Sequence, residues 1–359
     1  MKKAQTPVFL GIILVLIFVF VIYFLSFPFS GQEDNLQGKA EIQITSYTML
    51  NALDAAKSYI DTALDYSVYQ ACYEILEKSG WYEMPYDNVY NDGYENYGIW
   101  YSDENKSLKP PSDDEWKEGL EKKISDKLRV YASSAYRFLD DYYVYFPDYD
   151  VSVKSFAPGS LEVETTANKN MWIKKTTESG QEIYLEKAGS PGSVYNIDCY
   201  GVYKKAKEKN SEIVKDVKQR IESILNGFTL KGKGKLNQKD YVIFYEINKN
   251  LNWLSSGTFE AMEIQTTDHI LDDILGKEYT EGDYKIILDV LDADTDIKTE
   301  STVIKNNEKT IKFTITFNLV LKVKVTNTNR DQLFPVFTGE DTAFAPLKLI
   351  FVDKIQSVE

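Results

Sequence analysis

The sequence predicts an α+β protein in which an N-terminal transmembrane helix precedes further helices and antiparallel β-sheets. Three patterns carry this prediction. Residues 8–25 (VFLGIILVLIFVFVIYFL) contain no charged residue. Residues 112–141 and 202–225 repeat apolar residues at helical spacing. Residues 311–325 place apolar residues at every odd position, which is typical of a strand with one buried face. The order of these elements would fit two α+β units.

The first segment is long enough to cross a membrane. Its 18 residues would span about 27 Å as a helix, and the phenylalanines at 27 and 29 extend it, so residues 8–29 are expected to contact membrane lipid. Lys2 and Lys3 precede the segment, and Glu33 and Asp34 follow it. The positive-inside rule therefore predicts a single-pass protein of the cell membrane, with a cytoplasmic N-terminus and the bulk of the chain outside. No small-residue cleavage site follows, so the helix is expected to stay on the chain.

The run Lys2-Lys3-Ala4-Gln5-Thr6-Pro7-Val8, followed by Gly11-Ile12-Ile13-Leu14-Val15, resembles the N-terminus of archaeal type IV pilins and related class III signal proteins. The resemblance implies cleavage between Ala4 and Gln5. It also implies that the apolar helix remains on the mature chain and packs into a filament core, which would make other copies of the chain its partners. Phe9 stands where many of these pilins carry glutamate.

A second, weaker resemblance covers residues 60–140, which are similar to a group of uncharacterised archaeal membrane-anchored proteins. It is carried by Cys72, Ser79-Gly80-Trp81-Tyr82, Gly98-Ile99-Trp100-Tyr101 and Pro110-Pro111. This resemblance implies a location at the membrane and brings no activity with it.

The rest of the chain divides into predicted elements in order. Residues 1–30 form the leader and membrane helix, and the polar residues 31–45 form a spacer. Two extracytoplasmic units follow, at 46–200 and 201–359. The first is expected to hold a helix over 46–78 that ends at Gly80, a loop over 81–111, a helix opened by the capping box Ser112-Asp113-Asp114-Glu115, and strands. Those strands are expected at 149–155, 160–166, 171–176 and 181–187. The second unit is expected to hold the helix at 202–225 and an antiparallel sheet built from 284–291, 311–325 and 347–352.

The predicted loop 81–111 is rich in aromatic and polar residues. Aromatic rings beside carboxylates and amides suit a sugar-binding face, because the rings stack on sugar while the polar groups take the hydroxyls. The candidate ligand-binding residues are Trp81, Tyr82, Tyr97, Trp100 and Tyr101. The alternative is that these rings fix the loop onto the helices. Asn105-Lys106-Ser107 is a glycosylation sequon, which makes Asn105 a candidate for modification on an extracytoplasmic surface.

The chain has two cysteines, Cys72 and Cys199. Outside the cytoplasm they could form a disulfide that closes a long loop, and the alternative is a pair of buried thiols. With a single histidine, His269, and no CxxC motif, the sequence excludes the usual zinc sites. No cofactor is predicted.

The net charge of the chain limits the classes of molecule that it can bind. The net charge is −14, and the first 32 residues contribute two lysines, so the remainder carries −16. Such a surface repels phosphate backbones, and no nucleic acid is expected as a partner. The run Asp292, Asp294 and Asp296 is a candidate cation site, with a solvated acidic hairpin as the alternative.

No pairing of nucleophile and base is visible, so the chain is not expected to be an enzyme. The predicted function is a membrane-anchored, pilin-like surface protein that acts in assembly or adhesion. The alternative is an anchored receptor for a sugar, a peptide or a cation.

Overall fold

The computed structural model describes residues 33–134, 142–177, 180–225, 259–305, 308–329, 333–338 and 341–358. The predicted leader and membrane helix lie outside these residues. No helix in the described ranges combines the length and the apolar character needed to span a membrane. Mixed helices and sheets confirm the α+β class.

The chain forms two compact units. The smaller unit takes its described residues from 1–59, 133–147 and 169–189, and the larger unit takes them from 60–132, 148–168 and 190–359. Each unit is therefore assembled from separate stretches of the chain. This differs from the predicted division between residues 200 and 201, because strands that follow one another in sequence fold into different units.

Helix α2 runs without a break over Glu33–Glu77. The predicted spacer at 31–45 is therefore wrong for residues 33–45. This stretch is polar, but it contains no proline, and about half of its residues are Glu, Gln, Leu, Lys or Ala, which have high helix propensity. The predicted stop at Gly80 is confirmed: its φ is 87° and its N–H donates to the Ile75 carbonyl at 2.7 Å.

The smaller unit packs α2 against a three-stranded antiparallel sheet of order β3-β6-β7. The strands are β3 (Tyr143–Tyr145), β6 (Met171–Thr176) and β7 (Glu182–Lys187). Met49, Leu53 and Ala56 of α2 form one buried cluster with the alternate strand residues Val144, Met171 and Ile173. Lys187 forms an ion pair with Asp54 at the edge of this cluster. Alternation along the strands leaves their other face outside the cluster.

The larger unit is built on a six-stranded sheet of order β1-β2-β14-β11-β10-β9. Its long strands are β10 (Tyr284–Lys305), β11 (Glu308–Asn327) and β14 (Lys348–Val358), and its short ones are β1 (Val89–Asn91), β2 (Asn96–Ser102) and β9 (Glu278–Glu281). Odd positions from Ile315 to Val325 are buried. The predicted strand and its antiparallel neighbours are thus confirmed.

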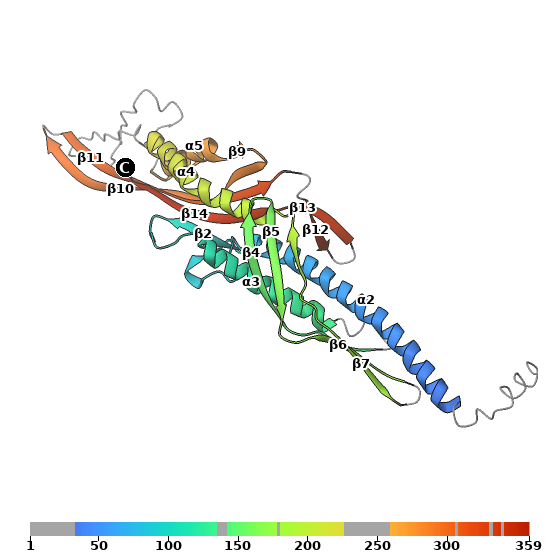
Figure 1. Cartoon of the computed structure of the whole chain (residues 1–359). Coiled ribbons are helices and arrows are strands. Elements are labelled where there is room, and N and C mark those ends of the chain that lie inside the picture. The colour runs from blue at the N-terminus through green and yellow to red at the C-terminus, as the bar shows by residue number, and fades with distance from the viewer. Residues whose placement is uncertain are drawn as a thin grey trace, which may run out of the picture. The chain divides into compact units, whose positions relative to one another are not determined.

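Two helices cover this sheet. Helix α4 (Cys199–Leu225) contacts β14 and β11, and α5 (Phe259–Ile274) contacts β10 (Figure 1). Helix α3 (Asp113–Ser134) begins with the predicted capping box, in which the Ser112 N–H donates to Glu115 at 2.7 Å. Two further sheets are β4-β5-β8, formed by Tyr149–Ala157, Ser160–Ala167 and Gly192–Tyr195, and β12-β13, formed by Leu333–Thr338 and Asp341–Pro346.

The predicted loop at 81–111 is wrong over much of its length. It contains the short helix η1 (Tyr86–Asn88) and the hairpin of β1 and β2. Strand β2 pairs in parallel with β14, with Ile99 opposite Val352. The partner strand lies some 250 residues further along the chain, so a local reading of residues 81–111 could not show that they enter a sheet.

One buried carboxyl lies between the sheet and α4. Asp353 of β14 is fully buried, and neither of its carboxylate oxygens has a hydrogen-bond partner among the described residues. Burial raises the pKa of Asp353 well above its usual value. The folded state therefore keeps a proton that the unfolded chain releases above about pH 4.

We predict that Asp353→Asn stabilises the protein near neutral pH. Wild-type stability should fall as pH rises from about 4 towards the raised pKa of Asp353, whereas the variant has no such proton to lose. The gain should be on the order of 1–3 kcal/mol near pH 8 and should vanish near pH 4. Urea unfolding at both pH values measures it. The exposed Asp150→Asn serves as control, and equal pH slopes for wild type and Asp353→Asn would refute the prediction.

Candidate functional site

The five aromatic residues proposed from sequence as a ligand face do not form one. Trp100 and Tyr97 are only 1% and 3% exposed. The Trp100 ring stacks on Phe351 with 4.0 Å between ring centroids, and its indole N–H donates to the Ser79 carbonyl at 3.0 Å. Trp81 and Tyr82 are half-buried. These rings belong mainly to the core, which agrees with the alternative interpretation of fixed rings.

Trp100 and Tyr101 nevertheless line a cleft of about 630 Å³ beside α4. Four lysines also line it, namely Lys109, Lys207, Lys215 and Lys218. Two of them are already paired, Lys218 with Asp103 and Lys207 with Asp113. Lys218 also lies over the Tyr101 ring, with its Nζ 5.0 Å from the centroid. Much of the positive charge in the cleft is thus neutralised within the protein.

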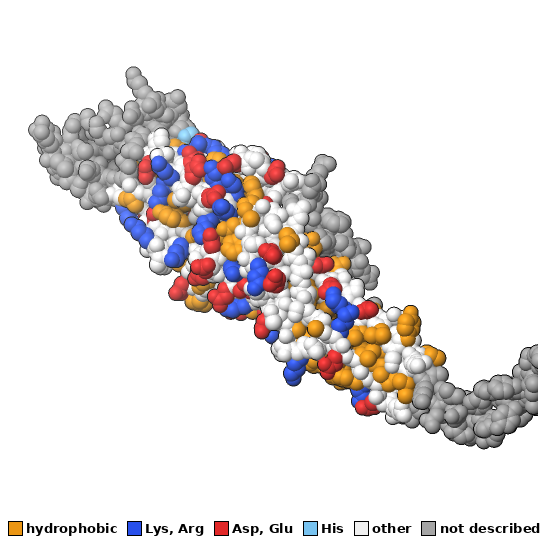
Figure 2. All heavy atoms as spheres, viewed as in Figure 1, with side chains coloured by type: hydrophobic (Ala, Val, Ile, Leu, Met, Phe, Trp, Pro, Cys, Tyr) orange, Lys and Arg blue, Asp and Glu red, His pale blue; other side chains and the backbone are white. Residues whose placement is uncertain are grey.

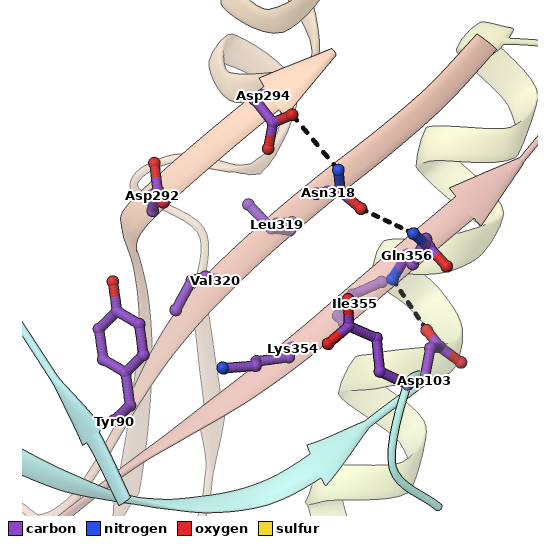
Figure 3. A pocket seen from close by; sticks show the side chains of 11 residues that line it. Tyr90, Asp103, Asp292, Asp294, Asn318, Leu319, Val320, Lys354, Ile355 and Gln356 are labelled. Atoms are coloured by element: carbon purple, nitrogen blue, oxygen red, sulfur yellow. Dashed lines mark hydrogen bonds between the residues drawn. The ribbon is translucent and has the colours of Figure 1, made fainter. Parts of the chain in front are cut away.

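The predicted cation residues lie on an extended strand. Asp292 and Asp294 of β10 line a shallow pocket of about 250 Å³, while Asp296 forms an ion pair with Lys298. Figure 3 shows the side chains of this pocket, with the α4 ribbon passing behind the strands. In the parts of the chain that the structure describes, no three Asp, Glu, His or Cys side chains are grouped to hold a metal ion.

The polar groups in this pocket satisfy one another instead. Asn318 donates to Asp294 at 3.3 Å and accepts a hydrogen bond from the Gln356 amide at 2.9 Å (Figure 3). The backbone N–H of Gln356 donates to Asp103 at 2.9 Å. This chain of hydrogen bonds ties β10, β11 and β14 to the residues after β2. It gives the pocket a structural role.

Cys72 of α2 and Cys199 of α4 lie together in the larger unit. Both are buried free thiols, and their Sγ atoms are 2.7 Å apart. Burial strongly raises the pKa of the Cys199 thiol. Because the thiolate is the form that exchanges with disulfides, the folded pair is a poor target for oxidation. The predicted disulfide would have to form before this core closes.

Asn105, the residue of the sequon, is exposed. Its side-chain oxygen accepts hydrogen bonds from the Ser107 hydroxyl at 2.6 Å and from the Ser107 backbone N–H at 3.2 Å. The sequon therefore lies in a surface turn, where an enzyme could reach it. Its glycosylation stays a prediction.

Sequence reasoning missed an aromatic surface in the smaller unit. Tyr143 and Tyr145 of β3, Trp172 of β6 and Tyr184 of β7 lie on one face of the sheet; we call them the aromatic platform. The Trp172 ring is nearly parallel to the rings of Tyr143 and Tyr145, with interplanar angles of 16° and 14° and centroid distances of 5.9 and 5.2 Å. Tyr184 flanks Trp172 at 5.3 Å.

The platform is open at the surface and has a polar rim. Tyr143 is 71% exposed and Tyr184 is 48% exposed. Around the rings, Lys174 pairs with Glu182, and the Asn170 amide donates to Glu186 at 3.2 Å. The sequence carries a trace of this face, since Tyr143 and Tyr145 flank Val144. A period of two does not say which of its two faces is buried.

A second exposed surface of the smaller unit lies on α2. Ile44, Tyr47 and Leu50 are 66%, 68% and 51% exposed and recur every three residues; we call them the apolar stripe. At 3.6 residues per turn they lie on the opposite side of the helix from Met49, Leu53 and Ala56. Figure 2 shows hydrophobic side chains gathered over the part of the surface formed by the first half of α2, β6 and β7.

We predict that Cys72 and Cys199 are oxidised to a disulfide during folding outside the cytoplasm, before the core closes over them, because the fold brings their Sγ atoms together. Protein isolated from its native host should then contain this disulfide. After unfolding without reductant, neither cysteine should react with iodoacetamide, and both should react after reduction. A double Cys→Ala variant should lose about 2–5 kcal/mol of stability relative to the oxidised protein, from the released loop-closure constraint. Full labelling before reduction would show that the alternative, a pair of buried thiols, is correct.

Both exposed surfaces of the smaller unit, the apolar stripe and the aromatic platform, are candidates for contact with another molecule. In the larger unit, many polar side chains that line the described pockets form ion pairs or hydrogen bonds with other residues of the protein. No protein-family model, curated protein or solved structure matches this chain.

Proposed function

We propose that this chain is a membrane-anchored, pilin-like surface protein that acts in assembly or adhesion. One observation carries the proposal: the exposed apolar stripe lies on a helix that begins four residues after the predicted membrane segment ends at Phe29. A contiguous row of exposed apolar side chains on one side of a helix is typical of a surface that contacts a partner.

The stripe fits contact between copies of the same helix. Ile44, Tyr47 and Leu50 stand at i, i+3 and i+6, which makes them one oblique ridge of the kind that packs into a groove of a neighbouring helix. The apolar residues 8–29 precede the stripe in the same chain. If the membrane segment packs in a filament core, as the resemblance to type IV pilins implies, the stripe would extend that packing beyond the lipid.

The proposal also explains the two-sided composition of α2. On one side of the helix, Met49, Leu53 and Ala56 hold the fold of the smaller unit. On the other side, the stripe contributes nothing to that cluster. Because Ile44, Tyr47 and Leu50 do not pack in the core of this unit, they are available for contact with another molecule.

We predict that the mature chain in its native membrane begins at Gln5. A peptidase that cuts after the short basic leader would remove Met1–Ala4 and keep the apolar helix. Mass spectrometry of the N-terminal peptide measures this directly. An intact leader, or cleavage after the apolar segment, would count against the pilin-like proposal.

We predict that replacing Ile44, Tyr47 and Leu50 together by Gln abolishes assembly without unfolding the protein. Gln keeps good helix propensity, and exposed substitutions usually change stability by less than about 0.5 kcal/mol each. Electron microscopy of cell-surface material, with an antibody to the extracytoplasmic part, measures filaments. The matched control is Ile264→Gln on α5, where the side chain is 57% exposed. Normal filaments from the triple variant would rule out the stripe as the assembly contact.

A further inference from the structure

We infer that the aromatic platform is a second contact between copies of this chain, in which the platform of one copy packs against the platform of another. The inference deepens the proposed assembly role and rests on it for the side-by-side placement of copies. It depends on other residues than the apolar stripe does, so the two contacts are tested separately.

The apolar stripe by itself joins copies in pairs. The sheet of the smaller unit covers the side of α2 that carries Met49 and Leu53, so α2 has its stripe to offer to the α2 of a neighbouring copy. Each copy then uses the same patch, and such an isologous contact closes after two copies. An assembly that grows beyond a pair requires a further contact on another surface of the protein.

The platform lies on a surface of the smaller unit that a stripe contact leaves uncovered. Val144 and Ile173 pack towards α2, and the alternate residues Tyr143, Tyr145 and Trp172 lie on the other face of the sheet. The stripe lies on the side of α2 away from that sheet. A copy that is paired through its stripe therefore still presents its platform to a third copy.

The rings of the platform have the properties of a protein contact surface. Trp172 is half-buried among three tyrosine rings, those of Tyr143, Tyr145 and Tyr184. Tyr143 and Tyr184 remain 71% and 48% exposed. Tyrosine and tryptophan are enriched where proteins bind one another. Rings that already pack together in the free protein lose little side-chain freedom on binding, so this face is preorganised for a contact.

The charges beside the rings suit a contact of this face with itself. The register of β6 and β7 places Lys174, Glu182 and Glu186 on the same face as the rings. One lysine and two glutamates give a net charge of −1, whereas the whole chain carries −14. The face therefore bears little of the negative charge that makes copies of an acidic chain repel one another. Between two platforms, the lysine of each copy is available to the carboxylates of the other.

Anchoring in one membrane brings the platforms of neighbouring copies to the same level. The predicted membrane segment ends at Phe29, and α2 begins at Glu33. Copies held by this segment lie side by side. Tyr47, at the middle of the stripe, and Leu53, which packs under the sheet, are six residues apart on α2, a rise of about 9 Å. Both surfaces of a copy thus meet the same surfaces of its neighbours at nearly the same height.

The test reconstitutes the purified full chain in lipid vesicles, with the photoreactive p-benzoylphenylalanine in place of Tyr184. Irradiation should crosslink two copies, and mass spectrometry should locate the second end of the crosslink on β3, β6 or β7 of the other copy. Adding Tyr143→Glu should lower the yield about tenfold, because like charges then face each other across the contact. Tyr143→Gln adds no charge and should lower the yield less.

Two controls accompany this measurement. Tyr86→Glu changes a 96% exposed ring of the larger unit and should leave the yield unchanged. The triple stripe variant, with Gln at 44, 47 and 50, should also keep the crosslink, because the platform contact does not use the stripe. Urea unfolding of Tyr143→Glu should match that of the wild type, so that a lower yield reports the contact and not the fold.

Several outcomes would overturn the inference. They are an absence of crosslinks between copies, crosslinks that end only on the stripe or on the larger unit, equal yields with and without Tyr143→Glu, and loss of the crosslink in the triple stripe variant. Crosslinks to lipid alone would assign the platform to the membrane surface. An intact leader at Met1 together with a retained platform crosslink would count against the pilin-like proposal and leave this contact standing.

Discussion

Helix α2 ends at a junction that fixes the larger unit. The Ser79 hydroxyl donates to the Ile350 carbonyl of β14 at 2.6 Å and accepts from the Gly98 N–H of β2 at 2.8 Å. A side chain at position 98 would meet Ser79, since a Cβ there would lie 2.7 Å from the Ser79 Cβ. The end of the helix thus joins the two strands that pair in parallel. The pairing of β2 with β14 adds the β1-β2 hairpin to the six-stranded sheet, although β2 and β14 lie far apart in sequence.

This junction also explains why the aromatic residues near it are internal. Trp100 donates to Ser79 and stacks on Phe351, and its ring meets Tyr203 of α4 edge-on. Trp116 of α3 stacks on Tyr203 in turn. The Tyr203 hydroxyl donates to the Pro111 carbonyl, whereas the buried Trp116 indole N–H has no hydrogen-bond partner among the described residues. The aromatic core therefore holds α2, α3, α4 and the sheet of the larger unit together.

The smaller unit distributes its apolar residues differently. Its cluster is small, and it leaves a row of rings and one side of α2 exposed. A surface protein that works by contact needs such faces, because the apolar residues that bury themselves in folding are lost to binding. In the proposed role, α2 therefore supports both the fold of this unit and an assembly contact.

Local chemistry alone determined several elements. The capping box at Ser112, the stop at Gly80, the alternation from Ile315 to Val325 and the strands at 171–176 and 182–187 all follow from periods and caps that neighbouring residues define. The uncharged run at 8–25 likewise predicts a membrane helix by itself, though it lies outside the described residues. The prediction of a spacer was wrong for residues 33–45, because a polar sequence is compatible both with a solvent-exposed helix and with an extended spacer.

Only the tertiary structure decided which aromatic residues are available for contact. Trp100 and Trp172 are the same residue type in similar local sequence, with aromatic or aliphatic neighbours on each side. Trp100 is buried by β14 and α4, while Trp172 is half-buried among tyrosine rings on the other face of a three-stranded sheet. The covering elements come from distant parts of the chain. Burial depends on those long-range pairings, and no local period encodes them.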